Sequence, residues 1–460
     1  MPKPPSPAAA LRAVVSRVEK SAAAKVKVAI TDIDGILRGK YIHKDKFLSA
    51  VQGNLGFCNV VFGWDAADTC YDNAGYTGWH TGYPDAQARL DLATFREVPW
   101  DDHVPFVLGE FVDQQGAPLA VCPRQLLRRV IGRATAAGYA LLTSLEYEFF
   151  NFRETAQSLA DKGHTRPQPL TPGMFGYSLI RLNQNRGYIN ALFDEMLAFG
   201  VPIEGLHTET GPGVLEAAIL YSHPLEAADR AVLFKTGAKE IGHRFGILPS
   251  FMAKWNADLP GCSGHIHQSL WDAAGKHNLF FDGRAPHKMS AICESYIAGQ
   301  LQALPDLLPL YAPTVNSYKR LVEGAWAPTR ANWGVDNRTT ALRMIPGSAK
   351  STRIETRVNG SDTNPYLALA AALASGLAGV EKRLTLDAAP IAGSGYQDGK
   401  SPILPRNLFE ATQRLDRSKL ARELLGDQFV DHFVATRLWE WRQFGKAVTD
   451  WETRRYFEII

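Results

Sequence analysis

The chain has 460 residues, of which 45% are hydrophobic and 21% are charged, and its 50 Lys and Arg against 47 Asp and Glu leave a net charge of +3. This near balance gives no argument for binding to nucleic acid or to a membrane surface. At about 150 residues per domain, the length predicts two or three domains. We find no run of about 18 apolar residues that would predict a membrane-spanning helix. The apolar run near the start, within residues 1–25, is too short and interrupted for a signal peptide.

The cysteines are few and scattered. They are odd in number and form no C-x-x-C pair, which argues against both a zinc knuckle and a disulfide framework. The five are Cys58, Cys70, Cys122, Cys262 and Cys293. This usage predicts reduced thiols in a cytoplasmic protein.

The first quarter of the chain predicts a small sheet. Residues 8–20 are typical of a short amphipathic helix, and strands at 26–30 and 37–42 are joined by a turn, which predicts a hairpin. Residues 104–112 predict a further strand. Between them, residues 53–82 are rich in Gly, Asp, Asn, Tyr and Trp without a regular period. An irregular segment of this length in a compact protein is more often functional than idle.

A helix over residues 124–137 begins after Pro123 and ends at Gly138, in the order expected of helix ends. We place a domain boundary just before it, which gives domains of residues 1–117 and 118–460. The rest of the chain alternates between strands and helices. The predicted elements are a strand at 144–150, a polar loop at 153–173, a helix at 185–199, a strand at 203–207, a helix at 224–245, strands at 247–254 and 263–270, and a helix capped by Asn364 and Pro365. This order favours α/β or α+β, with an antiparallel sheet as well supported as a parallel one.

Two acids stand out in the strand at 144–150. Glu146 and Glu148 are separated by one residue, so on a strand both side chains point to the same face. Two carboxylates on a mostly buried strand repel each other and are costly to remove from water. A divalent cation commonly compensates for such a pair. A solvated strand face is the alternative, and this stretch alone leaves it open.

Other short segments repeat this pattern. Two acids flank the Gly211-Pro212-Gly213 turn, two imidazoles alternate in Gly264-His265-Ile266-His267, and three charged residues alternate from Arg353 to Arg357. Each is weak alone. Together they supply oxygen and nitrogen ligands without a thiolate, which suits Mg²⁺ or Mn²⁺ better than zinc. Arginine forks beside such a cluster are suited to phosphate chemistry; these are Arg320, Arg338, Arg343, Arg353 and Arg357.

The motifs resemble the glutamine synthetase family in order and spacing, over nearly the whole chain from Asp34-Gly35 to Val448–Glu452. They are Glu146-Tyr147-Glu148, Glu209 to Glu216, Gly264 to Ser269, Asn316-Ser317-Tyr318-Lys319-Arg320, Asn337-Arg338, Arg353 to Arg357 and Asn364-Pro365-Tyr366-Leu367. The resemblance implies an α+β fold, with a β-grasp-like N-terminal domain and a catalytic domain whose curved antiparallel sheet forms an open-ended ATP funnel. It also implies a homo-oligomer of stacked rings, such as a dodecamer, with active sites at the subunit interfaces.

The resemblance also implies roles for individual residues. A first Mg²⁺ or Mn²⁺ would be held by Glu148, Glu209 and Glu216, and a second by Glu146, His265 and Glu355. ATP would be bound by His267, Ser269, Arg338, Arg343, Arg353 and Arg357. Glutamate would be bound by Gly261, Arg320 and Arg357. The catalytic residues would be Arg338, Glu355 and Asp65, the last acting as base on the amine from a neighbouring subunit.

The departures from the family pattern lie where the amine and the amino acid would bind. The flap that follows Arg320 carries Trp326 where the family has glutamate, and a second acid is replaced near Trp79. Pro260 stands before Gly261 in place of an asparagine, and the tyrosine loop that carries covalent nucleotidylation is not recognisable. Ammonium needs hydrogen-bond acceptors, whereas a substituted amine can bury its apolar group against an indole, at about 25 cal/mol per Å².

We therefore predict an ATP-dependent ligase that joins the γ-carboxyl group of glutamate to an organic amine through γ-glutamyl phosphate. A small alkyl or aryl amine is favoured, with Asp65, Trp79 and Trp326 forming the amine pocket. The first alternative is a glutamine synthetase that uses ammonia. A γ-glutamylpolyamine synthetase, with Asp68 and Asp72 as additional carboxylates, and a ligase for another acid are further alternatives. A non-catalytic structural homologue is disfavoured, because every metal and phosphate position is retained.

Overall fold

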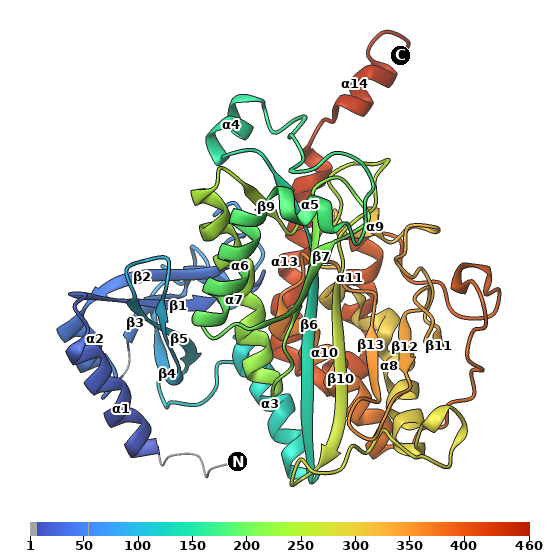
Figure 1. Cartoon of the computed structure of the whole chain (residues 1–460), viewed down its shortest axis with the longest axis horizontal. Coiled ribbons are helices and arrows are strands. Elements are labelled where there is room, and N and C mark those ends of the chain that lie inside the picture. Colours follow the sequence, from blue (N-terminus) through green and yellow to red (C-terminus); the bar gives the residue numbers. More distant parts are fainter. Residues whose placement is uncertain (1–6, 54) are drawn as a thin grey trace.

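The computed structural model describes residues 7–53 and 55–460, so the first six residues of the Pro-rich start lie outside it. Two sheets organise the chain, one of five strands near the N-terminus and one of eight strands in the remainder. Figure 1 shows the first sheet in blue beside a larger body in which helices lie behind long central strands. The predicted α+β class is confirmed. No helix in the described ranges is long and apolar enough to cross a membrane.

The N-terminal sheet has the strand pairing of a β-grasp. Its order is β2-β1-β5-β4-β3, in which β1 and β5 pair in parallel and the other neighbours pair antiparallel. The strands are β1 (Lys25–Thr31), β2 (Leu37–His43), β3 (Leu55–Cys58), β4 (Asp85–Val98) and β5 (Val104–Val112). The helices are α1 (Pro7–Lys20), α2 (Lys44–Ala50) and η1 (Asn59–Phe62). The hairpin and the β-grasp-like fold are thus confirmed.

Both faces of this sheet are covered, as the central strand shows. All nine residues of β5 are buried. Val107 and Phe111 pack in one core with Val18 of α1, whereas Phe106 and Leu108 join the larger core of the rest of the chain. Side chains alternate across a strand, so this alternation places the sheet between its own helices and the catalytic part.

The second sheet has the order β11-β12-β13-β10-β6-β8-β7, and β9 pairs with the end of β6. Its pairings are antiparallel except for β11 with β12. The strands are β6 (Tyr139–Phe152), β7 (Ile203–Thr208), β8 (Val214–Ile219), β9 (Leu248–Ser250), β10 (Gly264–Asp272), β11 (Trp333–Val335), β12 (Leu342–Ile345) and β13 (Arg353–Thr356).

Helices cover one face of this sheet. Leu145, Tyr147 and Phe149 of β6 are buried in a core shared with α7 and α10; in Figure 1, α10 lies behind β6 and β10, and α7 lies to the left of β6. The helices are α3 (Pro123–Ala136), α4 (Ala156–Asp161), α5 (Leu179–Gln184), α6 (Arg186–Ala198), α7 (Pro224–Arg244), η2 (Pro286–Lys288), α8 (Ala291–Tyr311), α9 (Ser317–Arg320), α10 (Pro365–Glu381), η3 (Gly395–Gln397), α11 (Leu408–Arg417), α12 (Lys419–Leu425), α13 (Asp427–Lys446) and α14 (Asp450–Tyr456). The opposite face remains available for a site.

Two sequence-based expectations need correction. The polar loop expected at 153–173 contains α4, which Thr155 caps through its side chain. The strand expected at 247–254 is only β9, because the chain pairs with β6 over Leu248–Ser250 alone. Helix α8 was not among the predicted elements; it contains Pro305 and Pro309, which are typical helix breakers. The boundary near residue 118 remains a prediction; it falls between β5 and α3.

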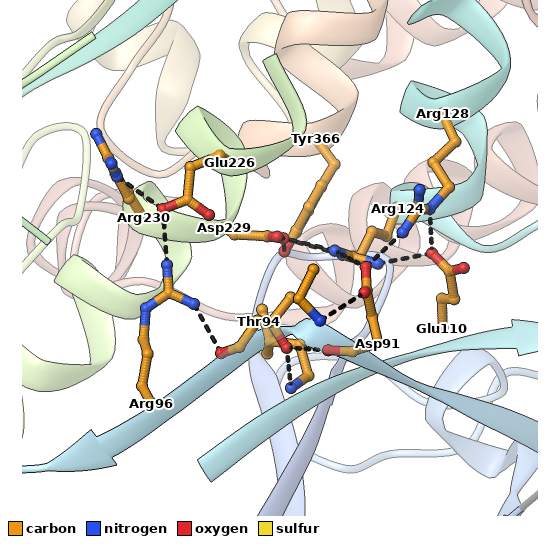
Figure 2. Close-up of polar contacts among 12 residues, drawn as sticks. Asp91, Thr94, Arg96, Glu110, Arg124, Arg128, Glu226, Asp229, Arg230 and Tyr366 are labelled. Carbon is orange, nitrogen blue, oxygen red and sulfur yellow. Dashed lines mark hydrogen bonds and ion pairs between the residues drawn. The ribbon is translucent and has the colours of Figure 1, made fainter. Parts of the chain in front are cut away.

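A buried polar network ties the two parts together (Figure 2). Arg124 of α3 donates to Glu110 of β5 at 2.7 Å and to Asp91 of β4 at 2.7 Å. It also donates from Nε to Asp229 of α7 at 2.9 Å. Tyr366 of α10 donates to the same Asp229 oxygen at 2.6 Å. One guanidinium therefore holds carboxylates from both parts, which fixes the N-terminal sheet against the catalytic helices.

Candidate active site

The open face of the eight-stranded sheet gathers the charged residues. Glu146 and Glu148 project away from the helix-covered side of β6, so the predicted shared face is confirmed. In the strand register, Glu146 lies opposite His265 and Glu148 lies opposite Glu216. His267 lies opposite Glu355. The side chain of Glu146 is only 21% exposed, so the alternative of a solvated face does not hold for this pair.

Glu148 is held by backbone and surrounded by charge. The backbone N–H of Ser263 donates to its Oε2 at 2.7 Å. Burial raises the pKa of Glu148, and the nearby charge of Glu209 raises it further, whereas Arg320 acts in the opposite direction. An acid in this setting gains from a cation that replaces its lost hydration.

Glu216 adds a third acid to this group. Its Oε1 lies 3.0 Å from Nε2 of His207. Burial raises the pKa of Glu216, and the charges of Glu146 and Glu148 raise it further, against the effect of His207. The turn before β8 is tight, because a Cβ at Gly213 would lie 2.4 Å from the backbone oxygen of Asn151. This turn brings Glu209 and Glu216 to the same end of β6.

A second group lies one row along the sheet. The Nδ1 atom of His265 is 3.2 Å from Glu146 Oε1 and 3.4 Å from Glu355 Oε1. The Nε2 atom of His267 is 3.9 Å from Glu146 Oε2. One potential ligand atom from each of Glu146, His267 and Glu355 lies within 4.8 Å of the others. Both imidazoles thus neighbour the same acids, although the resemblance assigns only His265 to the metal.

The carboxylates of the second group are stabilised as anions. Burial would raise the pKa of Glu146, but the interactions with His265 and His267 outweigh it and hold that pKa well below its usual range. Burial would also raise the pKa of Glu355. The charges of His265, Arg357 and others outweigh this effect and lower that pKa to about 2. The Nε2 atom of His265 is buried without a hydrogen-bond partner.

This donor set fits two hard divalent cations. Carboxylate oxygens dominate, with imidazole nitrogen beside them, which is the ligand chemistry of Mg²⁺ and Mn²⁺. The thiol of Cys262 is close to Glu148, but burial raises its pKa, which disfavours the thiolate that a zinc site would use. Glu148, Glu209 and Glu216 could hold one ion, and Glu146, Glu355 and a histidine the other.

Arginines border the second group. Arg343 donates from Nη1 to Glu355 Oε2 at 2.9 Å, and Arg357 donates from Nη1 to Glu355 Oε1 at 2.5 Å. Arg353 donates from Nε to His267 Nδ1 at 3.2 Å. The side chain of Arg338 is exposed, and its backbone oxygen accepts from Arg357 Nε at 3.0 Å. These cations line one margin of the carboxylate cluster, as phosphate binding requires.

The remaining residues that the resemblance assigns to nucleotide and glutamate binding lie on different segments of the chain. Ser269, further along β10, accepts from Trp271 Nε1 at 2.8 Å. Arg320 is fully buried and donates to Ser263 Oγ at 2.7 Å. Gly261 is packed so closely that an added Cβ would lie 2.5 Å from the backbone oxygen of Ala253 and 2.9 Å from Arg320 Cγ. A glycine is therefore required beside the Arg320 side chain.

The three residues of the predicted amine pocket are not gathered at this cluster. Asp65 accepts from Trp439 Nε1 of α13 at 2.9 Å. Trp79 is 79% exposed and contacts Tyr83. Trp326 is 57% exposed on the segment after α9. These three residues therefore stay a predicted pocket, in which the resemblance implies that Asp65 comes from a neighbouring subunit.

Sequence reasoning assigned no role to two residues that shape the site. His207 binds Glu216, and Tyr177 stacks on the His207 ring with centroids 4.3 Å apart. His207 lies opposite Glu216 in the pairing of β7 and β8, which the Gly211-Pro212-Gly213 turn between the two segments could have indicated. No sequence signal points to the second, because Tyr177 comes from a distant loop.

Comparisons with known proteins agree with this geometry. The glutamine synthetase catalytic domain matches residues 120–456. Type-1 glutamine synthetase 2 of Dictyostelium discoideum is 52% identical over 97% of this chain and 86% of its own length. Glutamate–isopropylamine ligase of a Pseudomonas species is 35% identical over 96% of this chain and 97% of its own.

A solved structure described as apo GmaS without ligand superposes with a TM-score of 0.83 at 26% identity, covering 96% of this chain and 99% of that chain. The similarity therefore extends through both sheets as well as the charged cluster. The chain belongs to the glutamine synthetase family and is a carbon–nitrogen ligase.

Proposed function

We propose that this enzyme joins the γ-carboxyl group of glutamate to a small alkyl or aryl amine, with ATP as co-substrate and Mg²⁺ or Mn²⁺ as the metal. The observation that carries the amine assignment is Trp326, an exposed indole on the flap next to the glutamate arginine. The similarity to a glutamate–isopropylamine ligase supports it. An indole covers an apolar substituent better than it covers ammonium.

The reaction has two steps. The γ-carboxylate of glutamate attacks the γ-phosphorus of ATP, giving γ-glutamyl phosphate and ADP. The free amine then attacks the acyl carbon, and the C–O bond to phosphate breaks. Divalent cations, when bound, neutralise the charge that spreads over the phosphates.

Residues of the chain position the reactants. Arg320 would bind the α-carboxylate of glutamate, beside the close backbone at Gly261. Arg357 and Arg343, both bonded to Glu355, would face the transferred phosphoryl group. Their fixed guanidinium groups stabilise developing charge without reorganisation. Arg338, whose side chain is exposed, would approach the same group when ATP is bound.

We also propose that the active site is completed in a ring-shaped homo-oligomer. Asp65, which would take the proton of the ammonium form of the amine, is held at α13 of its own chain and would serve a neighbouring site. The C-terminal segment adds support, since α14 extends away from the body in Figure 1. Val448, Trp451, Phe457 and Ile460 of this segment are more than half exposed. A dodecamer of stacked rings would cover such an arm.

Two organisational proposals accompany this function. The domains would meet near residue 118, between β5 and α3. The cytoplasm would be the location, because the five cysteines are unpaired and a reducing compartment keeps thiols free.

Ammonia is the second candidate amine. The observation that favours it is the 52% identity to a protein named as a type-1 glutamine synthetase. In that case Trp326 would pack in the closed flap rather than contact the substrate. Polyamines are less well supported, because Asp72 binds Arg442 and Asp68 binds Arg38 within the chain.

Phosphate release measured with ATP, glutamate and one amine at a time distinguishes these candidates. The panel contains ammonium, methylamine, isopropylamine, ethanolamine, aniline, putrescine and spermine. We expect kcat/KM for the preferred organic amine to exceed that for ammonium by about 10-fold or more, since each buried methylene is worth about 10- to 200-fold. Turnover with ammonium alone would refute the organic-amine proposal. Trp326→Glu should move the preference toward ammonium, whereas Trp326→Phe should leave it in place.

A further inference from the structure

The carboxylate of Asp65 is held by donors of its own chain. Its Oδ1 accepts from the backbone N–H groups of Ala67 and Thr69, both at 2.9 Å. Its Oδ2 accepts from the indole Nε1 of Trp439 at 2.9 Å. In the part of the chain that the structure describes, this indole is the one side chain that donates to Asp65. The two backbone donors belong to the local turn, so the position of Oδ2 depends on α13.

Helix α13 holds the segment that carries this acid through one of its faces. Ala435, Trp439 and Arg442 are separated by four and three residues, so they are neighbours on one side of the helix. The backbone oxygen of Ala435 accepts from Asn73 Nδ2 at 2.7 Å, and Arg442 forms an ion pair with Asp72. The contact of Trp439 with the acid lies between these two attachments, so the segment is fixed on both sides of it.

The indole of Trp439 is itself fixed. It is 6% exposed and packs in a small core with Tyr71 and Ala74. The Tyr71 ring lies edge-on to it, with centroids 5.8 Å apart. The guanidinium carbon of Arg442 lies 5.3 Å from the ring centroid. A buried indole N–H normally finds a partner, and here the partner is Asp65, which is only partly buried.

Packing against Tyr71 uses the ring of Trp439 and does not need its N–H. The N–H instead sets the plane of the Asp65 carboxylate, because rotation about the last torsion of an aspartate side chain has broad energy minima. A general base must lie within hydrogen-bond reach of the proton that it removes. A misplacement of about 1 Å at a reacting group can cost on the order of 100-fold in rate. The indole is therefore placed to affect the chemistry of this acid.

We propose that Trp439 is a positioning residue for the amine step, which orients the Asp65 carboxylate toward the ammonium form of the incoming amine. The inference rests on the proposed function, in which Asp65 takes that proton at a neighbouring site. The N–H bond of the ammonium group breaks, and an O–H bond forms on Asp65. The nitrogen keeps the electron pair and arrives uncharged at the acyl carbon of γ-glutamyl phosphate.

Two kinds of nucleophile test the role of Trp439. Methylamine and ammonium are charged at neutral pH, whereas hydroxylamine is uncharged and arrives without the extra proton. Trp439→Phe keeps an aromatic ring and removes the N–H donor. With methylamine or ammonium, whichever the parent turns over faster, we expect kcat/KM to fall about 10-fold, as for the loss of one hydrogen bond. With hydroxylamine, kcat/KM should stay within about twofold.

Trp441→Phe is the matched control, because Trp441 lies on the same helix and stacks on Phe409. This variant should equal the parent with both nucleophiles. Glutamate-dependent ATP hydrolysis without amine measures the first step alone, and it should stay within about twofold in both variants. If Trp439→Phe fails to fold, 3-benzothienylalanine at position 439 has the shape of tryptophan without the N–H and serves the same comparison.

Equal losses with both nucleophiles in Trp439→Phe would overturn the proposal, because a distorted site slows any amine. Unchanged rates with both nucleophiles would overturn it as well. Asp65→Asn separates this inference from the function on which it rests. If Asp65→Asn keeps the parent's rate with the charged amine, Asp65 is not the base and that part of the proposed function fails. If Asp65→Asn loses this rate and Trp439→Phe keeps it, the positioning role of Trp439 alone fails.

Discussion

Glu148 and Glu216 lie directly opposite each other in the antiparallel pairing of β6 and β8. Like charges in this relation are destabilising. The pKa values of both carboxyl groups are raised, first by burial and then by neighbouring acids. The chain therefore keeps an arrangement that costs folding free energy, which is expected where two acids share a cation.

Glu216→Gln should consequently stabilise the metal-free protein while removing its metal response. We expect the metal-free melting temperature to equal or exceed that of the parent, because one of two facing charges is gone. The rise in melting temperature on adding Mg²⁺ or Mn²⁺ should shrink, and activity should fall on the order of 100-fold. Thermal melts with and without metal, together with phosphate release, measure all of these.

Glu204→Gln is the matched control, because Glu204 lies on the adjacent strand β7 and is exposed. This variant should keep both the metal response and the activity. A Glu216→Gln protein that metal stabilises as strongly as the parent would show that the acid is not a ligand.

Alternation along strands explains why so much of this cluster could be predicted. Glu146 and Glu148, and equally His265 and His267, share a face whenever their segments are strands. Tyr177 could not be predicted, because its loop is held by backbone that is distant in sequence: its N–H donates to the backbone oxygen of Thr208 at 2.6 Å. Asp65 shows a further limit: its proposed role would depend on a neighbouring subunit, whose position the pattern of one chain does not give.

Arg124 is expected to be the most sensitive point of the contact between the two parts. Arg124→Met would leave the carboxylates of Asp91, Glu110 and Asp229 buried without their shared cation. Removing one partner of a buried ion pair costs about 3–5 kcal/mol. Urea unfolding followed by fluorescence should show a clearly lower midpoint.

The control for this loss is Arg17→Met. Arg17 pairs with Glu97 at 3.0 Å, but the two side chains are 56% and 37% exposed. Exposed pairs contribute about 0–1 kcal/mol, so its midpoint should remain near that of the parent. Equal effects of the two variants would contradict the role given to the Arg124 network.

The C-terminal arm is expected to hold subunits together. Phe457 is 86% exposed and Ile459 is 82% exposed, and large exposed apolar groups commonly mark protein interfaces. The double variant Phe457→Ser and Ile459→Ser should therefore reduce the mass of the particle measured by light scattering. Glu458→Gln, between them, should leave that mass unchanged. A full-size particle in the double variant would exclude the arm as the contact.

His432 of α13 should make stability depend on pH. Both ring nitrogens are buried without hydrogen-bond partners, and the ring packs edge-on against Phe62 and Tyr76 of the N-terminal part. Burial, followed by the charge of Arg437, lowers the pKa of His432 to about 4. The unfolded chain, with a pKa near 6.5, therefore binds the proton first as pH falls. Stability is expected to be lost below pH 6.5 and to keep falling until pH 4.

At pH 5 the loss from this one group is about 2 kcal/mol, from 1.5 pKa units at 1.36 kcal/mol each. His432→Leu removes the proton site, so the difference in unfolding free energy between pH 8 and pH 5 should shrink by about that amount. His277→Leu, at an 81% exposed side chain, should leave the difference unchanged. Urea unfolding at both pH values measures it. If His432→Leu keeps the parent's full pH dependence, another group is responsible for the acid sensitivity.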